Sequence, residues 1–212
     1  MRRLGLALLP LALSLAGCAG LLHSTQPALQ LYVLQAGVTP PVPSDTVSAG
    51  PTLRVARPLA APGLNTDRIA LLRPGSRLDY YAGSRWSAPL AEVVSAMQLS
   101  VFRADPAWRA VADERSSFNT DYVLQTSIDR FAAEYAADAG PPLIRVTLQC
   151  VLIRRSDGAL LGSFTVARSQ PALENRMASV IAAFSAAADQ AAVAAATQTD
   201  ALLRSAKPPA TP

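Results

Sequence analysis

The sequence predicts an α+β fold, a single compact domain in which an antiparallel-rich sheet packs against two main helices. Between residues 120 and 169, runs of alternating apolar and polar residues are separated by turn sequences, which is typical of an antiparallel meander. Two other segments, 88–103 and 172–204, carry apolar residues at the three- and four-residue spacing of a helix. The 212 residues show no internal repeat, and their number suits one domain with an ordinary core.

Residues 1–17 have the layout of a secretory signal. Arg2 and Arg3 precede a mostly apolar run, which ends at the small residues Ala16 and Gly17. The run is shorter than the roughly 20 apolar residues that a membrane-spanning helix needs, and no stop-transfer pattern follows it. We therefore expect these residues to direct export and then to be removed.

Cys18 follows directly, and Leu15-Ala16-Gly17-Cys18 resembles the lipobox of bacterial lipoproteins. In those proteins the thiol receives a diacylglycerol, the preceding residues are cleaved off, and the new amino group is acylated. Several acyl chains make a durable anchor, because each buried methylene contributes about 0.8 kcal/mol. The alternative is a cysteine in an uncleaved apolar helix. Ala19 rather than Asp comes next, which by resemblance to enterobacterial sorting predicts the periplasmic face of the outer membrane.

Removal of the signal would leave an almost neutral chain. The full sequence has 19 basic and 15 acidic residues, and the mature 195 residues keep 17 basic and all 15 acidic ones. Clusters of Lys and Arg interleaved with aromatic residues are absent from the sequence, so nucleic acid is not an expected partner.

The folded domain is expected at 29–205, after a lipidated tether at 18–28. In "LQLYVLQ", Leu29, Leu31 and Val33 alternate with polar or aromatic residues, which predicts a first strand. The next segment, "GVTPPVPSDTVSAGP", has four prolines and no apolar period, which predicts an irregular loop.

Three short strands are expected at 53–56, 68–72 and 77–82. The second and third flank Arg-Pro-Gly-Ser at 73–76, which suits a hairpin connector because Pro fixes one φ angle and Gly permits a positive one.

The helix over 88–103 is expected to have Ser87 as its N-cap, Pro89 in its first turn and Glu92 near its positive end. Its apolar face would consist of Leu90, Val93, Val94, Met97 and Val101.

The clearest strand patterns come later in the chain. Residues 121–135 place Tyr122, Leu124 and Ile128 on one face, and a Gly140-Pro141-Pro142 turn precedes the next strand, 143–155. The inward face of that strand is expected to carry Ile144, Val146, Leu148, Cys150 and Leu152. Asp157-Gly158 then predicts a tight hairpin into 159–170.

An Ala-rich helix is expected over 172–204, because alanine is the best helix former and lets a helix approach a sheet closely. Its apolar face would carry Met177, Val180, Ile181, Phe184, Ala188 and Ala191. Residues 206–212 should form a disordered tail.

The sequence points away from catalysis. Its single histidine, His23, excludes a Ser-His-Asp triad and a multi-histidine metal site, and it has no glycine-rich phosphate loop. Acidic pairs such as Asp113 with Glu114 are typical of solvated surfaces, and Cys150 lies among apolar residues like a small buried hydrophobe. No catalytic residue, metal or cofactor is therefore expected.

A candidate partner surface lies between residues 52 and 86. This stretch holds six arginines against two acidic residues, and it contains a cluster of aromatic residues in "DYYAGSRW". Such a surface suits an acidic partner or lipid headgroups. The alternatives are arginines scattered on solvent-facing strand positions and aromatic residues that anchor the core. The candidate residues are Arg68, Arg77, Tyr80, Tyr81, Arg85 and Trp86.

The order of these features resembles the ABC-type transport auxiliary lipoproteins. The resemblance covers nearly the whole mature chain and is sharpest from Asp67-Arg68-Ile69, through Tyr80-Tyr81, to Trp86-Ser87-Ala88-Pro89. It implies a compact α+β domain without covalent chemistry. It also implies a role at the outer membrane in docking or supporting a transporter of phospholipid-like or sterol-like molecules. The implied partners are an MCE-domain protein, a permease and an ATPase.

Two other functions remain open at this level. One is a direct lipid-binding module with a cavity between sheet and helices, and the other is a structural lipoprotein of outer-membrane assembly. The Ala-rich helix is also compatible with a homo-oligomer, because it can pack on its own sheet or on a second subunit.

Overall fold

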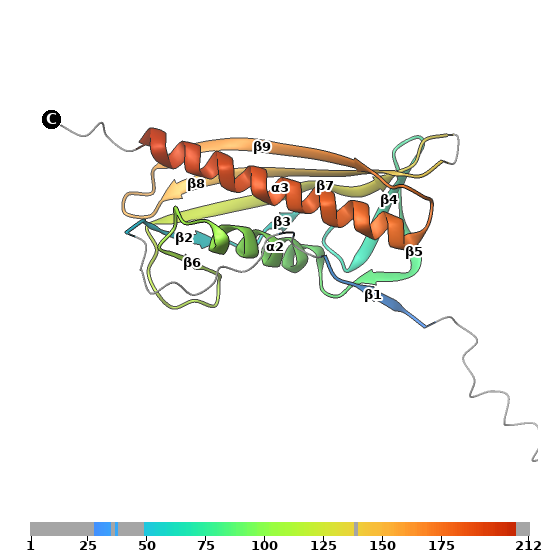
Figure 1. Cartoon of the computed structure of the whole chain (residues 1–212), viewed down its shortest axis with the longest axis horizontal. Coiled ribbons are helices and arrows are strands. Elements are labelled where there is room, and N and C mark those ends of the chain that lie inside the picture. The colour runs from blue at the N-terminus through green and yellow to red at the C-terminus, as the bar shows by residue number, and fades with distance from the viewer. Residues whose placement is uncertain (1–27, 35–36, 38–48, 138–139, 207–212) are drawn as a thin grey trace, which may run out of the picture.

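The computed structural model describes residues 28–34, 37, 49–137 and 140–206. Within them a nine-stranded sheet is covered on one face by two helices (Figure 1). The predicted α+β class is confirmed. The predictions for the signal, for Cys18, for most of the tether and of the 37–51 loop, and for residues 207–212 fall outside the described residues.

The sheet is built on β7 (Tyr122–Glu134), its longest strand. Strands β8 (Leu143–Arg154) and β9 (Leu160–Pro171) follow it in antiparallel order, so the predicted meander is confirmed. The Asp-Gly turn between β8 and β9 has Gly158 at a φ of 69°, which a residue with a side chain rarely adopts.

The other edge of β7 holds three short strands one after another. They are β2 (Thr52–Val55), β3 (Leu59–Ala60) and β4 (Arg68–Arg73), and all three run parallel to β7. The sheet is therefore mixed. The sequence patterns signalled hairpins only, and these parallel pairings were not foreseen.

Strand β5 (Arg77–Trp86) forms the predicted hairpin with β4, and its turn places Gly75 at a φ of 79°. Beyond β5 lies β1 (Gln30–Tyr32), which pairs with it in parallel and forms that border of the sheet. Strand β6 (Ala110–Ala112) pairs with β2 on the same side of β7.

A bulge in β7 changes which residues face the helices. Leu124 and Ile128 are buried at even positions, whereas Phe131 and Ala133 are buried at odd ones. The pairing register with β8 shifts between Ile128 and Arg130, so one extra residue is inserted there and the alternation changes parity. An uninterrupted alternation was therefore correct only for the first half of this strand.

Both helices differ from prediction at their first turn. Helix α2 (Leu90–Ala104) has Pro89 as its N-cap with no side-chain cap bond, so Ser87 does not cap it. Helix α3 (Met177–Ala206) begins five residues later than expected, because β9 stays paired with β8 as far as Pro171.

The core lies between the sheet and the helix layer. Helix α3 runs along β8 and β9 (Figure 1). Some of its alanines are buried there, including Ala187, Ala191 and Ala195. By length and composition alone α3 could cross a membrane; in this structure one face of it packs against β8, β9 and α2.

Candidate functional site

The six residues predicted to form a partner surface are distributed over different parts of the fold. Trp86 is only 1% exposed, so its predicted place on a surface is wrong. Its ring packs edge-on against Phe131 and Phe184, at centroid distances of 5.9 and 5.2 Å. The indole therefore anchors β5 to the core, which was the alternative that the sequence left open.

Tyr81 is half-buried and serves as a structural link. Its hydroxyl lies 2.8 Å from that of Tyr135, which in turn donates a hydrogen bond to Asn175 Oδ1 at 2.8 Å. This chain joins β5, the end of β7 and the segment before α3. Burial, followed by the hydrogen bond to Tyr135, raises the pKa of Tyr81 well above its usual value.

Arg68, Tyr80 and Arg85 do come together, and we call them the basic face. The Arg68 guanidinium lies 3.7 Å from the centre of the Tyr80 ring. In the register of β4 and β5, Arg68 lies opposite Arg85. Arg85 also forms an ion pair with Asp67 at 2.8 Å. One acidic and two basic side chains leave the basic face with a net positive charge.

Arg77 is separate from the basic face. It lies at the hairpin end of β5, opposite Arg73, which forms an ion pair of 3.2 Å with Asp79. A backbone hydrogen bond from Tyr80 and the bond from Arg73 lower the pKa of Asp79. Of the six predicted residues, three therefore share one surface.

Sequence reasoning missed a groove on the exposed side of α2, which we call the α2 groove. It has a volume of about 740 Å³ and lies between α2, the residues after β1 and the segment after β6. On α2 the groove is lined by three small residues, Ser95, Ala96 and Ser100, and by the more deeply buried apolar residues Val93, Met97 and Leu99. Charged residues of both signs form its rim, including Arg57, Glu92, Asp113, Glu114 and Arg115.

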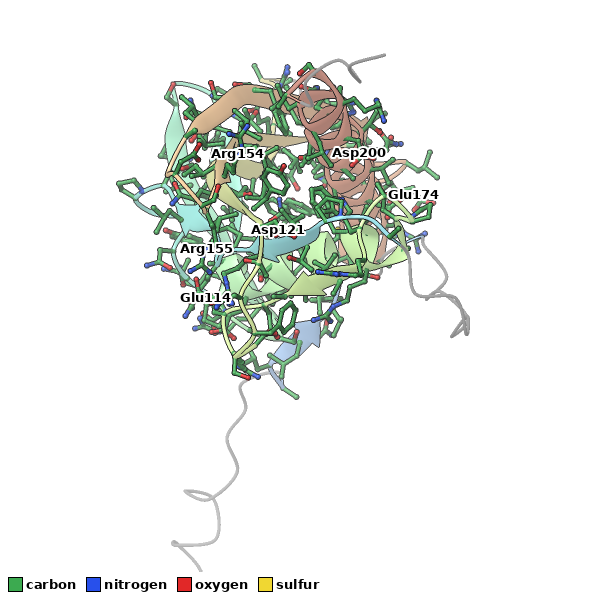
Figure 2. All side chains as sticks on the ribbon, turned by 90° about the vertical axis from the view of Figure 1, so that its left-hand side faces the viewer. Glu114, Asp121, Arg154, Arg155, Glu174 and Asp200 are labelled. Carbon is green, nitrogen blue, oxygen red and sulfur yellow. The ribbon has the colours of Figure 1, made fainter. Side chains whose placement is uncertain are left out.

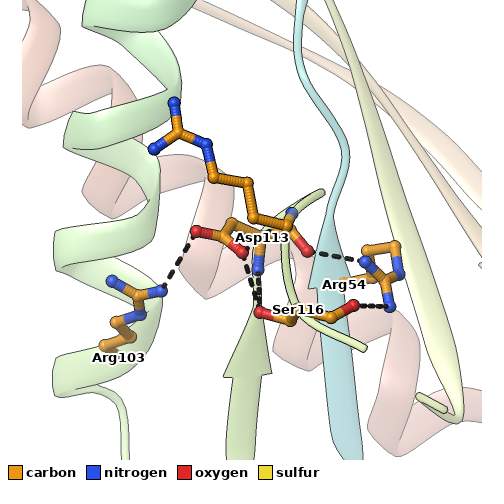
Figure 3. A network of polar contacts seen from close by, with 5 residues as sticks. Arg54, Arg103, Asp113 and Ser116 are labelled. Carbon is orange, nitrogen blue, oxygen red and sulfur yellow. Dashed lines mark hydrogen bonds and ion pairs between the residues drawn. The ribbon is translucent and has the colours of Figure 1, made fainter. Parts of the chain in front are cut away.

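Arg54 holds one wall of the α2 groove in place (Figure 3). From β2 its guanidinium donates to the carbonyl oxygens of Asp113 at 2.6 Å, Ser116 at 3.2 Å and Phe118 at 3.0 Å. The guanidinium fork thus satisfies several carbonyl groups of one loop at once. A single arginine in a short strand gives no sequence signal for this role.

The Asp113 carboxylate strengthens the same wall. It accepts hydrogen bonds from the Ser116 hydroxyl at 2.7 Å and from the Arg115 amide at 3.1 Å, and it lies 3.9 Å from Arg103 (Figure 3). The bond from Ser116 is the main cause of the lowered pKa of Asp113. Across the groove, Arg57 is paired with Glu92 at 3.0 Å. The α2 groove is thus organised before any partner arrives.

Other polar groups serve local structure. Asp121 accepts two hydrogen bonds from Thr52, each of 2.8 Å, and Arg154 is paired with Asp157. In the end-on view of Figure 2, Asp121, Arg154 and Arg155 lie on one side and Asp200 lies apart from them on α3. Among the described residues, no group of three or more His, Cys, Asp or Glu side chains could hold a metal ion.

Cys150 is buried on β8, as predicted. Burial raises the pKa of its thiol to about 11, so almost none of it is ionised at neutral pH. The side chain therefore behaves as a small hydrophobe within the core.

Comparison with solved structures agrees with this fold. A protein from Xanthomonas campestris is 25% identical, with a TM-score of 0.72, and the match covers 83% of this chain and 98% of that one. An uncharacterised protein is 12% identical with a TM-score of 0.65, over 82% of this chain and 99% of the other, which shows a shared fold alone. No curated protein matches the sequence.

The family comparison covers most of the described domain. The family model for the ABC-type transport auxiliary lipoprotein component matches residues 32–196, from β1 to the middle of α3. The chain therefore belongs to this family, whose members are envelope lipoproteins that work with ABC transport systems.

Proposed function

We propose that the protein is a non-enzymatic auxiliary component of an MCE-associated ABC lipid transporter, anchored through Cys18 to the periplasmic face of the outer membrane. The observation that carries the proposal is the family match over residues 32–196. In this role the protein docks or supports the transporter, and its partners are the MCE-domain protein, the permease and the ATPase.

We assign the contact with the transporter to the α2 groove. The small side chains of Ser95, Ala96 and Ser100 permit close approach by a helix or an extended segment, and Val93, Met97 and Leu99 beside them offer apolar contact. Its rim carries both charge signs, which favours register and specificity at a protein interface. Little ordering is required on binding, because Arg54 and Asp113 already hold the wall.

An Ala96→Arg variant tests this assignment. Ala96 lines the α2 groove and is exposed, so a long charged side chain there should fill the groove without disturbing the core. We expect co-purification with the MCE-domain protein to be lost while circular dichroism and the melting temperature stay unchanged. The matched control is Ala201→Arg, at an exposed alanine near the end of α3. Undiminished co-purification of the Ala96→Arg variant would place the contact elsewhere.

The lipid anchor has its own test. A Cys18→Ser variant should lose incorporation of radiolabelled fatty acid and should be released from the membrane fraction, because several acyl chains are needed for stable anchoring. Continued labelling and membrane retention would refute the anchor at this position.

The packing of the core argues against the lipid-binding alternative in its enclosed form. The cavity between α2, α3 and the sheet has a volume of about 10 Å³, which holds at most one water molecule. An acyl chain does not fit there without separation of the helices from the sheet.

A further inference from the structure

Strand β1 carries a stripe of exposed apolar side chains. Leu29, Leu31 and Val33 are 53%, 61% and 62% exposed, whereas Tyr32 and Leu34 on the opposite side pack against the core. Leu31 lies within β1, and Leu29 and Val33 directly flank this strand, so the three form one exposed apolar segment along this border of the sheet. We call them the β1 stripe.

The β1 stripe adjoins the basic face. In the strand register, Leu31 of β1 lies opposite Arg85 of β5, and Arg85 lies opposite Arg68 of β4. Cross-strand partners lie on the same face of a sheet, so these residues form one row. Tyr80, beneath the Arg68 guanidinium, completes the row.

This combination has the composition of a membrane-surface site. Leucine and valine side chains are stabilised when they enter the boundary between headgroups and acyl chains, because they leave water. Tyrosine side chains are enriched at the same depth of the membrane. Arginine binds phosphate through its planar fork, and basic residues are attracted to anionic lipid. Apolar, aromatic and basic groups are all present on the β1 stripe and the basic face.

The position of β1 in the chain, close to the expected lipid anchor, favours the lipid bilayer as the partner of this surface. Leu29 follows Cys18 by 11 residues, a distance that at full extension spans at most about 40 Å. An anchor at Cys18 would keep this surface at a high effective concentration near the membrane, so a weak site suffices. A β1 of only three residues offers little backbone for pairing with a second copy, since short edge strands discourage such pairing.

We propose that the β1 stripe and the basic face rest on the membrane surface, with the three apolar side chains among the headgroups and Arg68 and Arg85 at the phosphates of anionic phospholipids. The proposal rests on the lipid anchor of the proposed function. It fixes the orientation of the domain and leaves the outer part of the α2 groove open to a protein partner.

A fluorescent label at position 31 tests the contact. The lipidated Leu31→Cys variant would be reconstituted into vesicles of phosphatidylethanolamine and phosphatidylglycerol that contain brominated lipids. Cys150 should stay unlabelled because it is buried and its thiol pKa is raised. We expect a blue shift and quenching several-fold stronger than at Ala201→Cys, since the C-terminal end of α3 lies at the far end of the molecule from β1 (Figure 1).

The contribution of charge is tested on the same label. Arg68→Glu combined with Arg85→Glu should weaken quenching several-fold in these vesicles and much less in pure phosphatidylcholine. The control for one charge reversal is Arg155→Glu, at an exposed arginine that directly follows β8, at the end of the sheet opposite β1 (Figure 1). If Arg155→Glu weakened quenching as much as either Arg68→Glu or Arg85→Glu alone, the assignment of Arg68 and Arg85 would be overturned.

The remaining outcomes are equally decisive. A label at position 31 that stays in water, or that is quenched no more than the label at position 201, refutes the contact. A blue shift that depends on protein concentration and shows no quenching by brominated lipid would identify a second copy as the occupant instead. Co-purification with the transporter is measured separately, so failure of one proposal leaves the other standing.

Discussion

Gln98 is an unusual residue in the core. It lies on α2 with no exposed surface, and its Nε2 donates to Thr126 Oγ1 at 3.0 Å, while Thr126 lies 3.8 Å from Cys150 Sγ. The Gln98 Oε1 atom has no hydrogen-bond partner in the described structure. A buried acceptor without a partner costs about 1 to 3 kcal/mol, so this residue reduces the stability of the domain.

Replacement of Gln98 by methionine should therefore stabilise the protein. Methionine has a similar shape and adapts to irregular space, and it removes the unpaired oxygen at the cost of one hydrogen bond. We expect the free energy of unfolding in urea to rise by about 1 kcal/mol. A fall of similar size would show instead that the small cavity beside Gln98 holds a water that satisfies Oε1.

Asp200 on α3 is a second residue with a buried polar atom, here a carboxylate oxygen. Its Oδ1 atom is buried, and the carboxyl lies beside Asp105, Trp108 and Arg204. Burial, followed by the hydrogen bond and the negative charge of Asp105, raises its pKa to about 6, and Arg204 and Trp108 oppose the shift. The Asp200 carboxyl therefore keeps its proton in the folded state at pH values where the unfolded chain has lost it.

An Asp200→Asn variant should change how stability depends on pH. The pKa is raised on folding, so the stabilising contribution is complete below the unfolded value of 3.8 and is lost as pH rises through about 6. The asparagine variant lacks this loss. Its stability relative to the wild type should rise by about 1 kcal/mol between pH 4 and pH 7.5, a modest value because water screens the partly exposed pair.

Urea titrations across this pH range provide the measurement for Asp200. Gln190→Asn, a change without a titratable group at an exposed position of the same helix, is the control for the asparagine side chain. A constant stability difference between Asp200→Asn and the wild type would rule out a raised pKa at this position.

At the scale of elements, the alanines of α3 set its distance from the sheet. Ala187, Ala191 and Ala195 are fully buried against it, and no larger side chain intervenes at these positions. Close-packed interiors tolerate added volume poorly, because neighbouring side chains must leave their preferred rotamers or the backbone must shift.

Ala191→Leu should therefore destabilise the domain by about 1 to 3 kcal/mol, measured as a lower urea midpoint. Ala182→Leu makes the same chemical change on the exposed side of the same helix and should have little effect. Similar losses in both variants would mean that helix propensity rather than packing is responsible.

Sequence patterns predicted the elements that are regular over many residues. Strands β8 and β9, the β4–β5 hairpin and both helices have local signals, namely alternation, turn residues and helical spacing. Strands β2 and β4 were predicted, but their parallel pairing with β7 was not, because it joins segments far apart in sequence, and the two-residue strand β3 was not predicted at all. The bulge in β7 has no clear signal either, since Asp129 and Arg130 are both polar.

The candidate site was predictable only in part, for a related reason. The basic face could be foreseen from the local excess of arginine, whereas the burial of Trp86 depends on Phe131 and Phe184, which come from distant segments. The α2 groove depends on Arg54 reaching a loop about 60 residues away. Contacts of this range leave no periodicity in the chain.

At the scale of the whole molecule, the two proposed surfaces lie beside β1. Val33 belongs to the β1 stripe and also lines the α2 groove, so membrane contact and partner contact meet at one residue. If both proposals hold, the transporter would be met close to the bilayer surface. The opposite end of the domain, with Arg154 and Arg155, would then face away from the membrane (Figure 2).

The filled interior leads to a prediction for the folded domain as a whole. A ligand that binds only the folded state at a hundred times its dissociation constant adds about 2.7 kcal/mol of stability, which raises the melting temperature by about 5 °C or more for a chain of this size. The cavity between helices and sheet has room for at most one water, so an acyl chain gains no such binding energy there. Oleate below its micelle concentration should therefore leave the melting temperature unchanged, as butyrate does in a control scan. A saturating rise with oleate that persists in the Ala96→Arg variant and in the variant with Arg68→Glu and Arg85→Glu would show that α2 and α3 separate from the sheet to admit lipid, and the domain would then be a carrier as well as an adaptor.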